Sequence, residues 1–447
     1  MKRLLAIITA ALTLLGTQAA AVAQDRRVLT LDDCLRLALE QNPFYLAAQE
    51  REGGAKAQLD EAASRFFPSL NAQGLNTLTE KPFELVFPSL VPDQPPQKVK
   101  IDFTRDYQMS LSLSLPLFTG GRLLSGYRQA DYNLRATQEN SRQSRHETIF
   151  NVKKGFYGFL LAKHFVDVAE EASALAEDHY KTVKSLFEVG MASKFDLLRS
   201  EVEVANLKPQ LIRARNGLAV AELGLKSVLG LDLAENVEFR GELAFVPQDT
   251  DVELAVAEAI VERPDLAQLR FQQRMANEVL KIARASRLPT LALAGSYNFW
   301  ADQFKFTKGV WTNYYAVNLV LTVPIFNGFA ASAQVGQSKA LLRELELTQK
   351  GMTEMVKFEV RQAVLNYTQA REALLSQEKN VEQAREAVRI AELNYKEGLA
   401  TNLDVSGAQV ALSQARTNYS QALYDCVISQ AQLEKAVGRS RSESRSN

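Results

Sequence analysis

The chain has 447 residues, of which 46% are hydrophobic and 23% charged, so its composition is that of a folded protein and excludes a fully disordered one. Basic and acidic residues number 52 each, and the formal net charge of zero gives no bulk attraction to nucleic acid, so no nucleic-acid partner is expected. The cysteines and histidines have no metal-ligand spacing, so neither a metal site nor a cofactor is expected.

The first 23 residues have the pattern of a secretory signal peptide. Lys2 and Arg3 precede an apolar run from Leu4 to Leu15, and small residues follow up to Ala23. A membrane anchor is the alternative, but the run is shorter than the ~20 residues that a spanning helix needs. We therefore predict export, which allows a disulfide between Cys34 and Cys426, although a pair of small buried side chains is the favoured interpretation.

The pattern of the remaining residues predicts two copies of one structural unit. Pro116 matches Pro324 and Gly190 matches Gly398, each pair 208 residues apart. We expect a first repeat at 24–230, a linker with a short strand at 231–250, a second repeat at 251–438 and a disordered tail at 439–447. The first copy carries a longer loop at Lys81–Lys98, which has five prolines and is predicted to be irregular and exposed.

Each repeat is predicted to contain two strands, at about 69–78 and 105–117 in the first and about 290–300 and 313–325 in the second. Apolar side chains alternate with small polar ones, and the strand lengths are close to the ~9–11 residues that cross a bilayer at a tilt. A half-buried soluble sheet also alternates in this way. The expected lipid-facing residues are Tyr107, Met109, Leu111, Leu113, Leu115, Tyr315, Val317, Leu319, Leu321 and Val323.

Four strands cannot close a membrane barrel by themselves. About eight strands are the practical minimum, and an open sheet edge is not tolerated in lipid. Copies of this chain must therefore pool their strands, and two copies would make eight strands while three would make twelve.

Two long helices are predicted, at 122–189 and 330–397, each roughly 100 Å long at 1.5 Å per residue. Shorter helices at 196–229 and 404–437 follow, with heptad seams that predict coiled-coil packing. Each repeat therefore ends in a helical hairpin, and its tip turn is 190–196 or 398–404. An exported, non-conducting coiled-coil scaffold is an alternative, but it leaves the strands unexplained.

The two tip turns have the residues of a helix end followed by a helix start. Gly190 and Gly398 suit the left-handed position that ends a helix, while Ser193 and Thr401 suit N-caps. Asp196 and Asp404 then fall at the third helical position, where a carboxylate is favourable.

These features together resemble the TolC-like outer membrane efflux protein family, the outer membrane factors of tripartite efflux or type I secretion systems. The resemblance rests on "LTLDDCLRLALEQNP" at Leu29–Pro43, on the "PLFTG" and "PIFNG" junctions and on the two tip turns. It implies a mixed α+β membrane protein in which a homotrimer forms a 12-stranded β-barrel, four strands per chain. That barrel would be embedded in outer membrane lipid and continuous with a periplasmic α-helical coiled-coil barrel.

The resemblance also implies a role as an exit duct in the outer membrane of a Gram-negative bacterium, with a large periplasmic part. Its partners would be a periplasmic membrane-fusion adaptor and an inner-membrane pump of RND, ABC or MFS type. Small toxic compounds or drugs are the expected cargo, and type I secretion of polypeptides is the alternative. No nucleophile elbow, phosphate loop or paired carboxylates are found in the sequence, so an enzyme is not expected and no catalytic residue is proposed.

In the family, acidic residues at the tip of the second repeat ring the tunnel and hold it nearly shut. Asp404 matches the first such position, whereas Gly407 stands where a second aspartate is expected, and Asp196 is the weaker gating candidate. The residues expected to dock the adaptor are Val189, Gly190, Met191, Ala192, Ser193, Lys194, Phe195, Gly398, Leu399, Ala400, Thr401, Asn402 and Leu403.

Overall fold

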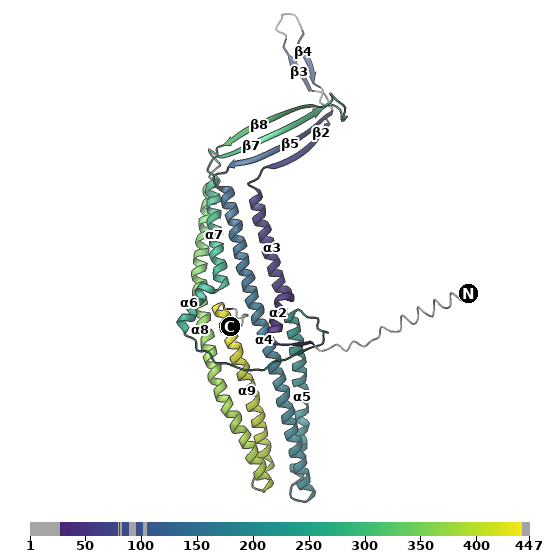
Figure 1. Cartoon of the computed structure of the whole chain (residues 1–447), viewed down its shortest axis with the longest axis vertical. Coiled ribbons are helices and arrows are strands. Elements are labelled where there is room, and N and C mark those ends of the chain that lie inside the picture. Colours follow the sequence, from purple (N-terminus) through teal and green to yellow (C-terminus); the bar gives the residue numbers. More distant parts are fainter. Residues whose placement is uncertain (1–26, 79, 81–82, 89–94, 102–104, 440–447) are drawn as a thin grey trace, which may run out of the picture. The chain divides into compact units, whose positions relative to one another are not determined.

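The computed structural model describes residues 27–78, 80, 83–88, 95–101 and 105–439 (Figure 1). The expected signal peptide, and the expected tail beyond Arg439, lie outside these residues. The described chain forms two compact units, and each unit takes segments from both halves of the sequence. The first unit comprises Met1–Leu46, Ser144–Ala259 and Lys357–Asn447, and the second comprises Ala47–Gln143 and Ile260–Val356.

The first unit is mainly helical. Its helices and strands are β1 (Arg27–Leu29), α2 (Leu31–Gln41), the second part of α4 (Arg122–Glu188), α5 (Lys194–Leu229), β6 (Val237–Phe239), most of α6 (Val252–Glu262), the second part of α8 (Ala330–Lys396) and α9 (Asn402–Val437). β1 and β6 pair in parallel. Helices α5 and α9 begin two residues before the expected starts, because Ser193 and Thr401 are the N-caps.

The core of the first unit lies where α2, α4 and α5 meet. Phe156 of α4 and Leu225 of α5 are fully buried there together with Cys34 of α2. Gly241 is required beside this core, because a Cβ at that position would lie 2.9 Å from the ring of Phe156. Burial of these side chains supplies the main driving force for the local fold.

The heptad seams of α5 and α9 lie on buried or half-buried faces. In α9, Val405, Leu412, Cys426 and Leu433 are buried at seven-residue intervals, apart from Tyr419, which is half-buried. Cys34 and Cys426 are both buried free thiols, so the disulfide that export allowed is not formed.

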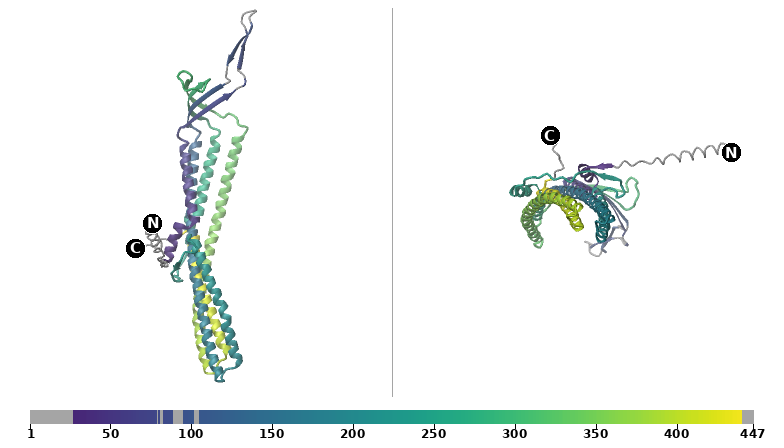
Figure 2. Two further views of the ribbon diagram at one scale, coloured as in Figure 1. Left: turned by 90° about the vertical axis from the view of Figure 1, so that its right-hand side faces the viewer. Right: turned by 90° about the horizontal axis from the view of Figure 1, so that it is seen from below.

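The lower helices of this unit follow the order α8, α9, α4, α5, which Figure 1 and the right-hand view of Figure 2 both show. Gln409 of α9 donates to Glu392 of α8. On the other side of α9, Glu434 pairs with Lys153 of α4 at 2.7 Å, and Arg215 of α5 pairs with Glu170 of α4 at 2.8 Å. Helices α8 and α5 are therefore the outer members of the row.

The second unit joins a sheet to helices. It contains most of α3 (Pro43–Ser64), β2 (Ser69–Leu78), β3 (Phe83–Phe87), β4 (Gln97–Ile101), β5 (Arg105–Phe118), the first part of α4, α7 (Pro264–Ala285), β7 (Thr290–Ala301), β8 (Thr312–Thr322) and the first part of α8. Four strands form one sheet in the order β2-β5-β7-β8, and every neighbouring pair is antiparallel.

The register of this sheet places the predicted apolar residues of β5 and β8 on a single face. Leu111 lies opposite Tyr297 of β7, and Tyr297 lies opposite Tyr315 of β8. Directly paired residues in an antiparallel sheet share a face, and alternate residues repeat it. Val323 is the exception: β8 ends at Thr322 instead of 325, where it pairs with Thr290, the first residue of β7.

The predicted irregular loop at Lys81–Lys98 is wrong in part. Its described residues include the antiparallel hairpin formed by β3 and β4, in which Leu85 lies opposite Val99. The described prolines of this stretch, Pro88, Pro95 and Pro96, lie outside the two strands, where they do not interrupt the ladder.

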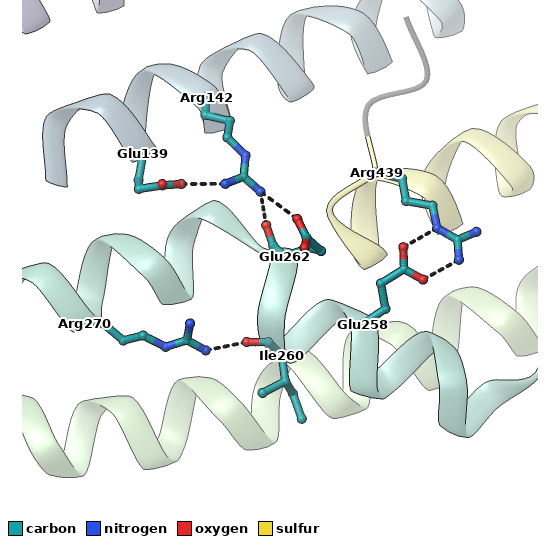
Figure 3. Close-up of polar contacts among 7 residues, drawn as sticks. All are labelled: Glu139, Arg142, Glu258, Ile260, Glu262, Arg270 and Arg439. Atoms are coloured by element: carbon teal, nitrogen blue, oxygen red, sulfur yellow. Dashed lines mark hydrogen bonds and ion pairs between the residues drawn. The ribbon is translucent and has the colours of Figure 1, made fainter. Parts of the chain in front are cut away.

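Arginine side chains bind helix-end carbonyls in the second unit and form an ion pair in the first, as Figure 3 shows. In the second unit, Arg142 donates to the carbonyl of Glu262 and Arg270 to that of Ile260, so the last turn of α6 has partners for its free carbonyls. In the first unit, Arg439 forms a two-bonded ion pair with Glu258.

Candidate site at the hairpin tips

The two tip turns have matching backbone geometry. Gly190 and Gly398 adopt φ of 78° and 74°, which is the left-handed region that glycine enters without strain. After each glycine, the next residue's N–H bonds back to a carbonyl in the last helical turn, from Met191 to Leu186 at 2.7 Å and from Leu399 to Asn394 at 2.8 Å. Each helix therefore ends in a Schellman-type turn.

Both aspartates close a capping box. In the first turn, the Ser193 hydroxyl donates to Asp196 Oδ2 at 2.5 Å, and the Asp196 N–H donates back to Ser193 Oγ at 3.0 Å. In the second, the Thr401 hydroxyl and N–H donate to Asp404 Oδ2 at 2.7 and 2.8 Å. The Thr401 hydroxyl, followed by its N–H, holds the pKa of the exposed Asp404 carboxyl below its ordinary 3.8, so Asp404 is anionic at neutral pH.

Most of the tip residues expected to dock an adaptor are exposed. The exposed apolar side chains among them are Val189, Met191, Phe195, Leu399 and Leu403. Lys194 Nζ lies 5.6 Å from the centre of the Phe187 ring, a cation–π distance that holds its charge beside the turn. Apolar side chains at this density on a turn are typical of a contact surface.

Asn402 departs from this expectation because its side chain is only 4% exposed. It bridges the two hairpins. Its Oδ1 lies 2.6 Å from Nε2 of His179 in α4, and its Nδ2 donates to the carbonyl of Asp196 in α5 at 3.1 Å. The His179 ring also packs edge-on against Tyr395 of α8, at 5.2 Å between ring centres. This group, which we call the tip bridge, consists of His179, Asn402, Tyr395 and the carbonyl of Asp196.

The tip bridge was not predicted from the sequence. His179 and Asn402 are 223 residues apart, and although Asn402 belongs to the second tip turn, His179 belongs to no motif. The short-range patterns of a coiled coil identify which residues face a seam, but not which polar side chains meet across it.

Polar side chains continue along this end of the packed helices. Ser200, Ser406 and Gln409 are all buried, and Gln409 Oε1 has no hydrogen-bond partner. Farther along the same helices the seam is apolar, with Val152, Phe156 and Val427 buried. Apolar side chains are buried beside these polar ones, among them Val183, Val405 and Leu412. The seam near the tips is therefore mixed in character, whereas the seam near the core is apolar.

The other predicted site residues do not belong to this region. The expected lipid-facing residues lie in β5 and β8 of the second unit, apart from Val323, which follows β8. Within the described ranges, no helix has a stretch apolar and long enough to span a membrane. The same residues contain no group of three or more side chains suited to holding a metal ion.

Comparison with known proteins identifies the family. The model of the family described as outer membrane efflux protein matches residues 34–231 and 255–439 of this chain. The chain belongs to the outer membrane efflux protein family. The predicted resemblance is thereby confirmed, and so is the predicted location, an outer membrane protein with a large periplasmic part. Because this is a family of channels, membership also supports the expectation that the chain is not an enzyme.

The relatives extend over nearly the full chain. Outer membrane protein TolC of Vibrio cholerae is 24% identical over 450 residues, covering 98% of this chain and 96% of the relative. The alkaline protease secretion protein AprF of Pseudomonas aeruginosa is 25% identical over 439 residues, covering 93% and 85%. The solved open state of the Neisseria gonorrhoeae MtrE outer membrane channel has a TM-score of 0.75 at 20% identity, covering 92% of this chain and 89% of that one. The fold is therefore that of TolC-like channels.

Proposed function

We propose that this protein is the homotrimeric outer membrane exit duct of a tripartite export system. In this role it passes small toxic compounds or drugs from an inner-membrane pump and a periplasmic adaptor to the outside. The observation that carries the proposal is the four-stranded sheet, whose two outer strands, β2 and β8, each have one edge that no other described strand pairs with. An outer membrane sheet must close, and other copies of the chain supply the missing strands.

The strand directions suit closure by identical copies. All three neighbouring pairs are antiparallel, so β2 and β8 run in opposite directions. β8 of one copy therefore meets β2 of the next as another antiparallel pair, and the pattern continues around a ring. Three copies give the 12-stranded barrel of the family resemblance, with the apolar face of β5 and β8 toward lipid.

The helical part offers a second pair of free edges. The α5 edge stripe consists of the exposed residues Leu198, Val202, Ile212, Val220 and Leu223. The α8 edge stripe consists of the exposed residues Phe358, Leu365, Leu375, Ile390 and Leu393. At 100° per residue each stripe lies opposite the seam that its helix makes within the chain. Since α5 and α8 are the outer helices of the row, we infer that these stripes meet between copies and complete the coiled-coil tube.

The family match also supports the internal duplication and the two expected repeats. One family model matches twice, at residues 34–231 and 255–439, and these segments correspond to the predicted repeats at 24–230 and 251–438. A duplicated gene product explains why each half supplies two strands of the main sheet and one helical hairpin.

The tips are proposed as the gate and the docking surface. Asp404 closes the tunnel by placing an anionic ring at its mouth, with Asp196 as the weaker candidate, and the exposed apolar residues of the two turns contact the adaptor. Asn402 acts inside the tip bridge rather than on the docking surface, because its side chain is buried. The pump would be of RND, ABC or MFS type.

Export of a polypeptide is a second candidate function. The relative AprF is named for alkaline protease secretion, whereas the relative TtgC of Pseudomonas putida, 24% identical over 421 residues, is named a probable efflux pump outer membrane protein. The two functions share one duct and differ in the pump that loads it, so growth of a tunnel-deficient host on small antibiotics, compared with its secretion of a protease, separates them.

Single-channel recording of the purified protein in a planar lipid bilayer tests the duct itself. We expect a particle with the mass of three chains that conducts weakly at rest and strongly once the tips are released by substitution. A particle that never conducts, with intact or altered tips, would contradict the duct and favour a closed scaffold.

A further inference from the structure

The β3–β4 hairpin has one apolar face, and no other described strand pairs with it. It forms a sheet of its own. A two-stranded hairpin is marginally stable in water unless something covers one of its faces. The hairpin is part of the longer β2–β5 connection of the first repeat, so its presence has no counterpart in the second repeat.

The two faces of the hairpin differ in character. Leu85 and Val99 are paired opposite one another, and Phe87, two residues along, shares their face. Phe87 is 51% exposed. On the other face Glu84 and Lys100 form an ion pair at 3.2 Å, and Val86 lies opposite Lys98. The charged face is therefore suited to contact with water. The other face, which carries Leu85, Phe87 and Val99 and which we call the hairpin apolar face, is suited to contact with an apolar partner.

A second apolar surface lies on the connection between β7 and β8. Phe304 packs against Phe306 and Trp311, with ring centres 5.1 and 6.3 Å apart, and against Tyr107 of β5 at 5.4 Å. Trp311 Nε1 donates to the carbonyl of Lys305 at 2.9 Å, which fixes the loop around the rings. Despite this packing, Phe306 remains 75% exposed. We call Phe304, Phe306 and Trp311 the aromatic loop cluster.

Both surfaces lie at the same end of the main sheet. Leu78 and Arg105, which flank the β2–β5 connection, are paired, and so are Trp300 and Thr312, which flank the β7–β8 connection. Tyr107 of β5 lies opposite Ala301 of β7, so the two connections leave the sheet at one level.

The strand order brings these surfaces together between copies. In a closed ring, β8 of one copy is the neighbour of β2 of the next, so the aromatic loop cluster that precedes β8 adjoins the hairpin that follows β2. We propose that the hairpin apolar face packs on the aromatic loop cluster of the adjacent copy and forms an intersubunit clasp. The clasp rests on the proposed homotrimer, and it assigns the extra segment of the first repeat to assembly.

Site-directed crosslinking tests the clasp. Two differently tagged chains, one carrying Phe87→Cys and the other Phe306→Cys, are produced together and treated in membranes with a short bis-maleimide. The clasp predicts a crosslinked pair that contains both tags. The matched control replaces Phe87→Cys with Val86→Cys, which is one residue away but on the opposite face of the hairpin, and we expect at least a severalfold lower yield. The parent chain, with Cys34 and Cys426 buried, gives the background.

The native mass of the same samples separates this proposal from the one on which it rests. A particle of three chains with no crosslink, or with equal yields from Phe87→Cys and Val86→Cys, overturns the clasp while leaving the trimer intact. A chain carrying both Phe87→Cys and Phe306→Cys that crosslinks only within itself also overturns it. Absence of the trimer overturns the proposed assembly and the clasp together.

Discussion

At the residue scale, the two tip aspartates have the same local explanation. Each accepts a hydroxyl and an N–H bond from its N-cap residue, and each lies in the first turn of a helix, where its charge favours the helix dipole. Capping alone therefore accounts for both residues, and any difference between them must come from their place in the assembled tunnel.

We expect Asp404→Ala to raise the single-channel conductance, because it removes charge from the proposed closed mouth. Asp196→Ala is the matched control, since it removes the same capping box from the other hairpin. Similar thermal destabilisation of both variants, with a conductance change in Asp404→Ala alone, supports gating. An equal conductance change in both would contradict the stronger gating role proposed for Asp404.

The tip bridge gives a second prediction at this scale. Asn402→Ala leaves His179 buried without its partner, and an unsatisfied buried polar group costs about 1–3 kcal/mol. We expect a lower melting temperature and more frequent channel openings, because the bond joins α9 of one hairpin to α4 and α5 of the other. Asn216→Ala, at an exposed position of α5, is the control and should change neither quantity.

The two cysteines give a third prediction at the residue scale. Burial raises the pKa of the Cys34 thiol to about 12 and that of Cys426 to about 11, so both are protonated and unreactive near neutral pH. We expect no alkylation by iodoacetamide in the folded protein at pH 8 and labelling of both thiols in denaturant, as read by mass spectrometry. Labelling of either thiol in the folded protein would contradict its buried position.

At the element scale, the glycines that end α4 and α5 have different roles. Gly190 and Gly230 both have positive φ, of 78° and 76°. A Cβ on Gly190 would meet nothing within 4 Å, whereas one on Gly230 would lie 2.6 Å from the carbonyl oxygen of Gln41 in α2. The first position needs glycine for its backbone alone, and the second also needs it for the close approach of α2.

We therefore expect Gly190→Ala to cost about 1–2 kcal/mol, the strain of a left-handed alanine. Gly230→Ala should cost that amount plus about 1–3 kcal/mol for the steric overlap with α2. Thermal unfolding followed by circular dichroism compares the two variants. Equal melting temperatures would show that the contact between α2 and the end of α5 relaxes freely.

At the scale of the whole molecule, the free edges of the sheet and of the helical row both point to assembly. Ile212 lies at the centre of the α5 edge stripe and is 67% exposed in the single chain. Fully burying an isoleucine contributes roughly 1.5–3 kcal/mol, and a glutamate at the same position forfeits this apolar contribution.

We expect Ile212→Glu to weaken each of the proposed interfaces by at least about 2 kcal/mol and to shift the protein from trimer toward single chains in dilute detergent, as measured by native mass. Gln210→Glu introduces the same charge at an exposed position on another side of α5 and should leave the trimer intact. Equal dissociation of both variants would show that the α5 edge stripe is not an interface.

Much of the fold follows from short-range patterns in the sequence. Proline and glycine positions, period-two alternation and heptads predicted the strands, hairpins and tip turns to within a few residues, because each depends on neighbours along the chain. The β3–β4 hairpin was missed, since prolines suggested a breaker where they flank two short strands. The end of β8 was misplaced because its partner strand begins at Thr290, which pairs with Thr322, and the pattern along β8 does not show where its partner begins.

By itself, the sequence determined the capped tips, the amphipathic strands and the family, and it predicts the repeated unit. Tertiary structure alone decided the order β2-β5-β7-β8, the burial of two unpaired cysteines and the bond between His179 and Asn402. The physical reason is distance along the chain. Periodicity records which side of an element faces its surroundings, whereas pairing between residues some 200 positions apart depends on how complete elements pack.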